Sequence, residues 1–271
     1  MIEIDIDKIN SFIPSEVKAF IRKLNRSDYE VYLTGSCVRN IVLQSLGYPN
    51  VPQTEIWEIS TNATIEQFEK YIPPHTYNYY AAKCHVQMFT LKSSNNDMIF
   101  CKIRTYRTND NWKMCRAVDD SGYLPNLTDN LIEDLSHRDF AINAMAYNPN
   151  KDIGLIDSFG GLIDIENRMI RCINNPYNCF AESNIRILRA IRIAYQLGFG
   201  IEQGTSNAIK QKAYLFYNDN TSLVEIEQEL AELVQITKNT NDDKKIIALE
   251  DIVRNYSEVF TTILLKEIIE K

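Results

Sequence analysis

The chain lacks several features that would assign it to a specialised class of protein. Its six cysteines include no C-x-x-C pair, which argues against both a zinc site and a disulfide framework. No stretch approaches the roughly 20 apolar residues of a membrane span, and the first residues do not combine basic side chains with a long apolar run. We therefore expect a cytoplasmic protein with no membrane association, whose cysteines are buried free thiols.

An excess of positive charge is also missing. The net charge is −7 at pH 7, whereas a general RNA-binding protein normally carries an excess of Lys and Arg. Any contact with RNA must then come from a local basic patch. With 271 residues, 45% of them hydrophobic and 24% charged, the chain is expected to bury a sizeable core in one large or two modest domains.

Residues 29–63 are the most informative stretch, and they predict a strand, a tight turn, a helix and a second strand. Val31 and Leu33 alternate with more polar neighbours, as in a half-buried strand that ends at Gly35. Gly35 and Ser36 permit a turn that leaves free N–H groups at the start of the helix. Such a turn can bind a phosphate group. The second strand is predicted near residues 56–59.

The flanking patterns extend this unit into a small α/β domain. An amphipathic helix is predicted after Pro14, a helix over 64–71, and two strands over 86–91 and 99–106. The polar segment 108–126 has no sustained periodicity, which predicts a long loop beside the site. A neck helix is predicted within 179–199, and further helices over 207–217, over 223–237 with Ser222 as N-cap, and from residue 244 onward.

Four ordered motifs carry a family resemblance. They are GSCVRN with ISTNA (residues 35–40 and 59–63), HRDFAINA (137–144), DSFGG (157–161) and ESNIRILRAIR (182–192). In this order they resemble the motifs of the class II nucleotidyltransferases, the family of bacterial poly(A) polymerases and CCA-adding enzymes. The resemblance implies a palm-like α/β head with a mixed sheet, residues 1–137, followed by an all-helical neck and shortened body, residues 138–271.

The resemblance also shows where metal-binding carboxylates are missing. Its register puts Ile56 and Glu58 at the two aspartates of the family, and Lys102 at the acidic position of a neighbouring strand. Nucleotidyl transfer of this kind uses two divalent ions about 3.5–4 Å apart. Glu58 is the one retained candidate for a catalytic carboxylate. Glu55 lies three residues earlier and faces the other side of a regular strand. We therefore expect no bound metal and no cofactor, with Mg²⁺ required only by an active alternative.

The same resemblance implies a set of nucleotide-binding residues. For residues 138–143 the alternative is that Asp139 and Asn143 brace neighbouring loops, since buried polar groups must be paired. For the neck helix predicted within 179–199 the alternative is a core helix with a solvated basic flank. Ser183 replaces the aspartate that reads the base in the family, so weak base selectivity is expected. The implied set is Gly35, Ser36, Arg39, Arg138, Asp139, Asn143, Arg186 and Arg189.

Two hypotheses for function follow. The first is a catalytically degenerate family member that binds nucleotide or RNA through the cleft between head and neck, or that pairs with an active homologue or another protein. The alternative is an active RNA nucleotidyltransferase, acting on tRNA 3′ ends or poly(A), with relocated metal ligands. The degenerate reading predicts that the Lys102 ammonium neutralises Glu58. Otherwise Lys102 extends to solvent and Glu58 pairs with Arg104, Arg107 or nothing.

Overall fold

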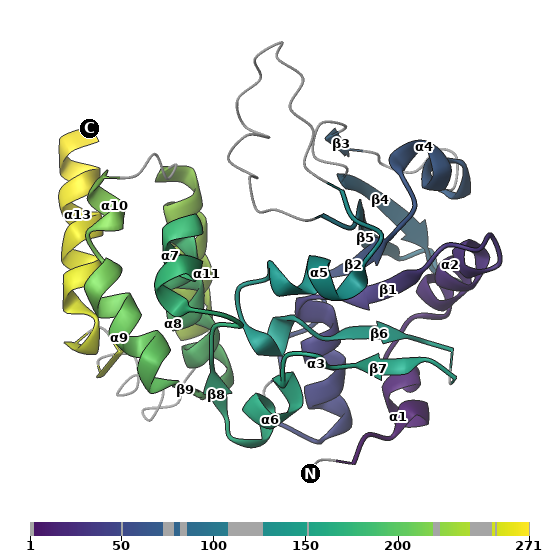
Figure 1. The fold of residues 1–271 in the computed structure, drawn as a ribbon, viewed down its shortest axis with the longest axis horizontal. Coiled ribbons are helices and arrows are strands. Elements are labelled where there is room, and N and C mark those ends of the chain that lie inside the picture. Colours follow the sequence, from purple (N-terminus) through teal and green to yellow (C-terminus); the bar gives the residue numbers. More distant parts are fainter. Residues whose placement is uncertain are drawn as a thin grey trace. The chain divides into compact units, whose positions relative to one another are not determined.

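The computed structural model describes residues 3–49, 51–72, 79–81, 86–107, 127–150, 152–218, 223–238, 251–252 and 254–270. The chain divides into two compact units. The first consists of Met1–Arg138 and Ile142–Leu162, and the second of Asp139–Ala141 and Ile163–Lys271. Figure 1 labels the helices and strands of both units.

The first unit is built on a mixed β-sheet. Its described residues form seven strands in the order β3-β4-β5-β2-β1-β6-β7. Strands β2 and β5 pair in parallel, and the other described pairs are antiparallel. The strands are β1 (Val31–Thr34), β2 (Ile56–Thr61), β3 (Tyr79–Ala81), β4 (Val86–Lys92), β5 (Met98–Thr105), β6 (Ala146–Asn148) and β7 (Gly154–Ile156).

The central strands β1, β2, β4 and β5 confirm the strands predicted from alternation. Strands β6 and β7 were not predicted, because three residues are too few to show a period of two. β6 pairs with β1 and β7 pairs with β6, which returns residues 142–162 to the first unit. The predicted boundary after residue 137 lies near the first of the three points at which the chain passes between the units, after residues 138, 141 and 162.

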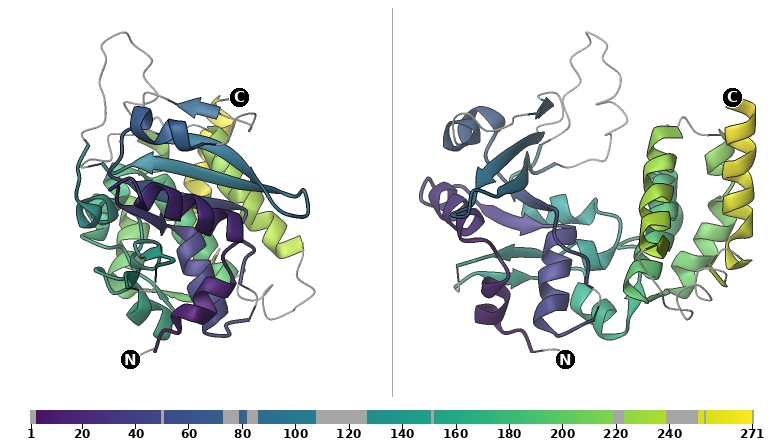
Figure 2. Two further views of the ribbon diagram at one scale, coloured as in Figure 1. Left: turned by 90° about the vertical axis from the view of Figure 1, so that its right-hand side faces the viewer. Right: turned by 180° about the vertical axis from the view of Figure 1, so that it is seen from behind.

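Helices cover one face of this sheet. They are α1 (Ile6–Ser11), α2 (Ser15–Asn25), α3 (Ser36–Ser45) and α4 (Ile65–Phe68), with a 3-10 turn at Glu69–Tyr71 (Figure 2). α5 (Leu131–Ser136) lies on the other face, where its Leu131 and Leu135 pack with Tyr32 and Ala146. α2 contacts β1 and β4, and the rings of Phe20 and Phe89 lie 4.9 Å apart. α3 contacts β1 and β2 and buries Cys37 and Val38.

The opposite face of β2 and β5 stays open, and this decides where the candidate site lies. In β5, Cys101 and Ile103 are fully buried, whereas Phe100 is 48% exposed. Successive side chains of a strand point to opposite faces, so Phe100 and Lys102 share the open face. Glu58 stands opposite Lys102 in the parallel register and lies on the same face.

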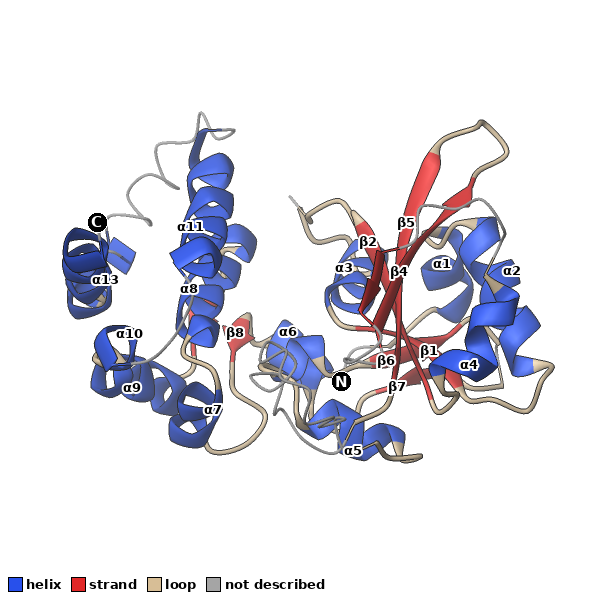
Figure 3. Ribbon diagram, turned by 90° about the horizontal axis from the view of Figure 1, so that it is seen from above, coloured by secondary structure: helices blue, strands red, loops and turns tan. Residues whose placement is uncertain are grey.

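The second unit is mainly helical (Figure 3). Helix α8 packs on α11, α7 on α9, and α10 on α13. The prediction of an all-helical region over 138–271 is wrong in two details, because β6 and β7 belong to the sheet of the first unit and β8 and β9 form a short parallel pair. α6 (Gly161–Glu166) spans the boundary between the units. The remaining elements are α7 (Pro176–Glu182), α8 (Ile185–Leu197), α9 (Gln203–Lys212), α10 (Leu215–Asn218), α11 (Leu223–Lys238), α13 (Ser257–Glu270), β8 (Met169–Ile170) and β9 (Gly200–Ile201).

Some predictions fall on residues outside the described ranges, namely the loop 108–126, the N-cap Ser222 and two cysteines, Cys84 and Cys115. The other four cysteines are buried free thiols, as predicted. Among the described residues, no helix is both long and apolar enough to cross a membrane.

Candidate functional site

An ion pair between Glu58 and Lys102 lies at the centre of the open face. The two residues are direct partners in the parallel β2–β5 register. Lys102 Nζ donates a hydrogen bond to Glu58 Oε1 at 3.1 Å, and the side chains of Lys102 and Glu58 are 32% and 24% exposed. The predicted pair is therefore confirmed. Lys102 does not extend away from Glu58 into solvent.

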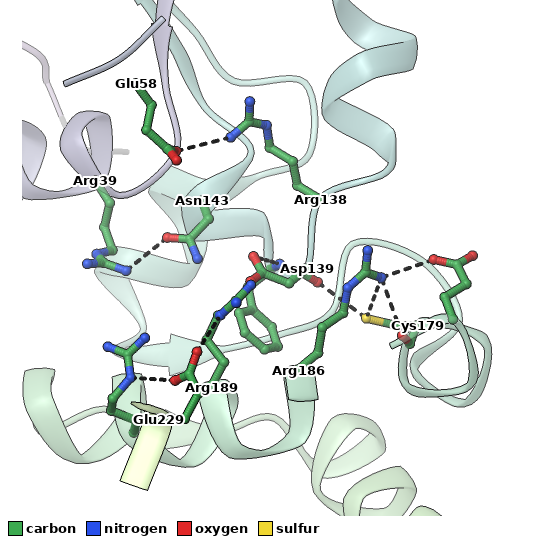
Figure 4. Close-up of polar contacts among 12 residues, drawn as sticks. Arg39, Glu58, Arg138, Asp139, Asn143, Cys179, Arg186, Arg189 and Glu229 are labelled. Carbon is green, nitrogen blue, oxygen red and sulfur yellow. Dashed lines mark hydrogen bonds and ion pairs between the residues drawn. The ribbon is translucent and has the colours of Figure 1, made fainter. Parts of the chain in front are cut away.

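Arg138 joins this pair from the residues that follow α5. Its Nη1 lies 3.9 Å from Glu58 Oε2, and the side chain is only 7% exposed (Figure 4). Arg138 Nη2 donates to Ser60 Oγ at 3.2 Å and lies 3.5 Å from Asp134 Oδ2. Glu58, a predicted catalytic position, and Arg138, a predicted nucleotide-binding residue, are thus brought together.

Three residues that contact this group, Ser60, Arg104 and Asp134, were not predicted as site residues. Arg104 Nε donates to Ser60 Oγ at 3.4 Å, and Asp134 contacts Arg138 from within α5. The sequence holds a signal for Ser60 and Arg104. Ser60 and Arg104 stand two residues after Glu58 and Lys102, so the period of two places all four on one face. We call the group the β2–β5 charge cluster, made of Glu58, Ser60, Lys102, Arg104, Asp134 and Arg138.

The cluster holds more positive than negative charge. Burial alone would raise the pKa of Glu58, but the charges of Lys102, Arg104 and Arg138 outweigh it and lower that pKa to about 2. Burial and the like charge of Arg104 lower the pKa of Arg138 to about 10, although Asp134 and Glu58 act in the opposite sense. The Arg138 guanidinium is therefore only partly compensated by its acidic neighbours.

A pair of divalent metal ions does not fit these residues. Lys102 already donates to the Glu58 carboxylate, and an ammonium at that distance repels a dication. Ile56, at the position of a family aspartate, offers no ligand atom, and Glu55 is exposed just before β2. Within the described ranges, no group of three or more His, Cys, Asp or Glu side chains is placed to hold a metal ion.

The Gly35–Ser36 turn faces the same carboxylate. Gly35 has φ 79°, a conformation that favours glycine, and it precedes the first residue of α3. A Cβ atom at position 35 would collide with Glu58 Oε2, so the carboxylate lies directly against the turn. No side chain caps α3, and its first turn holds no acidic residue. The turn predicted to bind phosphate therefore has the carboxylate of Glu58 beside it.

Arg39 is used inside the protein rather than presented on the open face. It is 4% exposed, and its Nη1 donates to Asn143 Oδ1 at 2.9 Å. Its Nε and Nη2 donate to Asn40 Oδ1 at 3.1 and 2.9 Å. These bonds brace α3 against the 3-10 helix Ala141–Asn143. The geometry matches the bracing alternative stated for Asn143 and does not expose Arg39 to a phosphate.

The helix α5 does not continue through residues 138–143. α5 ends at Ser136, and only Ala141–Asn143 form a short 3-10 helix. The reason lies in the hydrogen bonds of Asp139, whose Oδ1 accepts from the N–H of Phe140 at 2.8 Å. Such local side-chain bonds compete with helical ones.

The neck arginines form intramolecular ion pairs within the second unit. Arg189 Nη1 donates to Asp139 Oδ2, and its Nε to Glu229 Oε1, both at 3.1 Å (Figure 4). Arg192 Nε donates to Glu229 Oε2 at 2.7 Å. Burial lowers the pKa of Arg189, but the charges of Asp139 and Glu229 outweigh burial and raise it. Helices α8 and α11 are joined by these bonds.

Arg186 is held in a separate group. It is buried, and its Nη1 lies 3.0 Å from Glu182 Oε2, 3.3 Å from the carbonyl oxygen of Cys179 and 3.5 Å from Cys179 Sγ. Ser183, at the position of the family's base-reading aspartate, is also buried. The predicted nucleotide-binding set thus falls into separate groups. Gly35 and Arg138 lie beside Glu58, Ser36 begins α3, Arg39 contacts Asn143, Asp139 contacts Arg189, and Arg186 contacts α7.

Comparison with known proteins agrees with this architecture. The family model "Poly A polymerase head domain" matches residues 31–171. The chain is 30% identical to the CCA-adding enzyme of Lacticaseibacillus paracasei over 207 residues, which are 76% of this chain and 47% of that enzyme. It is 31% identical to the CCA-adding enzyme of Enterococcus faecalis over 202 residues, which are 73% of this chain and 45% of that enzyme. The chain spans about half the length of these curated relatives.

Solved structures show the same fold. The CCA-adding enzyme of Bacillus stearothermophilus in complex with CTP aligns with a TM-score of 0.65 at 27% identity, over 80% of this chain and 47% of that one. The CCA-adding enzyme of Thermotoga maritima complexed with tRNA aligns with a TM-score of 0.64 at 23% identity, over 93% of this chain and 55% of that one.

Proposed function

The chain belongs to the poly(A) polymerase head-domain family of class II nucleotidyltransferases, and from this membership we propose that it binds a nucleotide or an RNA end without transferring a nucleotide. It is an RNA nucleotidyltransferase-like protein by sequence and fold. The altered carboxylate positions bear on whether the protein can transfer a nucleotide as well as bind one.

The Glu58–Lys102 ion pair is the observation that carries the proposal. In the family, the corresponding positions hold metal-binding carboxylates, whereas here Lys102 supplies an ammonium 3.1 Å from the one retained carboxylate. Two-metal transfer depends on ions that activate the attacking hydroxyl and stabilise the leaving phosphate. With Ile56 at the third position, these three positions offer one carboxylate, that of Glu58, where that chemistry uses three.

The open face retains properties that suit a nucleic-acid ligand. Lys102 and Arg104 place positive charge on this face, and phosphate contacts supply most of the affinity in such complexes. Beside them, Phe100 and its register partner Ile56 are 48% and 38% exposed. An exposed aromatic ring next to cations can stack on a base without selecting its sequence. The relative in complex with CTP supports a nucleotide as one ligand of this family.

An active nucleotidyltransferase is the second candidate, because the similar curated proteins are CCA-adding enzymes. Incorporation of labelled ATP or CTP into a tRNA or an oligo(A) primer, with Mg²⁺ or Mn²⁺, separates the two. We expect no extension above a protein-free control. Extension that Glu58→Ala abolishes would establish the second candidate, and extension that survives Lys102→Ala would also contradict the first.

Binding is tested independently of catalysis. Fluorescence anisotropy of labelled oligo(A) or ATP in EDTA should report binding that weakens as salt is raised, with little preference between bases. Lys102→Ala should weaken binding, whereas Lys8→Ala, at an exposed residue of α1, should not. If neither ligand binds, the proposal of nucleotide or RNA binding is wrong. Tight co-purification with a homologue would then support the pairing role.

A further inference from the structure

We propose that the Glu58 carboxylate is an internal anion seated in a phosphate-binding site, formed by Lys102, Arg138 and the Gly35–Ser36 turn, and that a ligand phosphate binds by displacing it. The inference deepens the proposed function and rests on it for the identity of the natural ligand. It assigns Glu58 a role opposite to that of a metal ligand, since the carboxylate would oppose binding.

The position of the carboxylate is the first observation. Its Oε1 accepts from Lys102 Nζ, its Oε2 faces Arg138 Nη1, and Oε2 packs directly on Gly35. Each of these groups is a usual contact of a phosphate oxygen: an ammonium, a guanidinium and the start of a helix. One carboxylate therefore occupies the point on which the three groups converge.

Unfilled hydrogen-bonding capacity is the second, independent observation. Among the described residues, the buried Nε of Arg138 has no hydrogen-bond partner. Arg138 Nη1 lies 3.9 Å from Glu58, beyond hydrogen-bonding distance. A buried charged donor without an acceptor is unfavourable. Glu58 therefore satisfies this guanidinium incompletely, and a larger anion with more oxygen atoms is suited to complete its contacts.

The balance of charge also favours a phosphate over the Glu58 carboxylate. Lys102, Arg104 and Arg138 face two carboxylates, those of Glu58 and Asp134, so the cluster holds one positive charge in excess. The ten-residue helix α3 adds the positive end of its dipole. A phosphate group carries more negative charge than a carboxylate, so exchange of one for the other improves the balance.

Glu58 is also able to leave. Its side chain is partly exposed on the open face of β2, where, among the described parts of the chain, no helix covers the neighbouring Phe100 or Ile56. By contrast, Asp134 is fully enclosed and cannot be exchanged in the same way. Displacement therefore requires rotation of one surface-accessible side chain, with Asp134 still compensating Arg138.

The test is calorimetric titration of inorganic tripolyphosphate in EDTA at low salt. Glu58→Gln removes the negative charge and keeps the volume of the side chain. Glu55→Gln is the matched control, because it removes the same charge from an exposed residue just before β2. We expect the wild type and E55Q to bind weakly and equally, and E58Q to bind at least about tenfold more tightly. Lys102→Met in the E58Q background should abolish that gain.

The inference is overturned if E58Q binds tripolyphosphate no better than E55Q, or if no variant binds it. Circular dichroism establishes that each variant is folded. If E58Q fails to fold, Glu58→Asp replaces it, because the shorter side chain withdraws the carboxylate from Gly35 by one methylene. This variant should bind tripolyphosphate more tightly than the wild type and E55Q.

Parallel titrations with ATP and oligo(A) separate this inference from the proposed function. Tighter tripolyphosphate binding by E58Q, with no binding of ATP or oligo(A) by any variant, would support the phosphate site and contradict the proposed function. Binding of ATP or oligo(A) by the wild type, with no gain for any ligand in E58Q, would support the proposed function and overturn the internal anion.

Discussion

Replacing Lys102 with Met should destabilise the first unit by about 1–2 kcal/mol, a value set by the partial burial of the ion pair. Met keeps a similar length and removes the charge. Exposed ion pairs contribute about 0–1 kcal/mol, and loss of one partner from a buried pair costs about 3–5 kcal/mol. The side chains of Lys102 and Glu58 are 32% and 24% exposed, and Arg138 remains near Glu58, so an intermediate value is expected.

Urea unfolding monitored by Trp57 fluorescence measures this effect. Trp57 is buried in β2 next to Glu58, and a Trp112→Phe background leaves it as the sole tryptophan of the two in the chain. Lys92→Met, at the exposed end of β4, is the matched control and should change the free energy of unfolding by less than about 0.5 kcal/mol.

A double-mutant cycle with Glu58→Gln isolates the pair itself. We expect a coupling energy of about 1–2 kcal/mol between positions 58 and 102. A coupling energy below about 0.3 kcal/mol would refute the reasoning, because the observed contact would then stabilise neither partner.

Three further predictions concern acid, metal and the second unit. Glu58 has a pKa of about 2 in the folded chain against 4.5 ordinarily, so its stabilisation is present above pH 4.5 and is lost as the pH falls towards 2. The free energy of unfolding measured in urea should fall by on the order of 3 kcal/mol over this pH range, and this fall should be absent in Glu58→Gln. Ile56→Asp combined with Lys102→Glu restores three carboxylates, so millimolar Mg²⁺ should raise the melting temperature of this variant by about 5 °C and that of the wild type by less than about 1 °C. Glu229→Gln should destabilise the second unit by about 2 kcal/mol in thermal unfolding, because two arginines of α8 lose their shared carboxylate, whereas Glu227→Gln at an exposed position of α11 should have little effect.

The sequence by itself determined the local elements and the family. Alternation in 31–34 predicted one strand of the sheet, a second strand was predicted near 56–59, and Gly35 with Ser36 predicted the turn between β1 and α3. These features depend on neighbouring residues, so a linear pattern is enough to show them. The same holds for the predicted absence of metal-binding carboxylates at Ile56 and Lys102, which depends only on residue identity once the motifs set the register.

Beyond the predicted Glu58–Lys102 pair, only the tertiary structure decided which polar and charged groups meet. Arg39 and Asn143 lie 104 residues apart in sequence, yet they form a buried hydrogen bond that the motifs did not predict. β6 returns to the edge of β1 because pairing there satisfies its backbone hydrogen bonds, a gain that no local pattern records. The contact of Glu58 with Gly35 likewise depends on the fold, because β2 and the Gly35–Ser36 turn are brought together only when β2 pairs with β1.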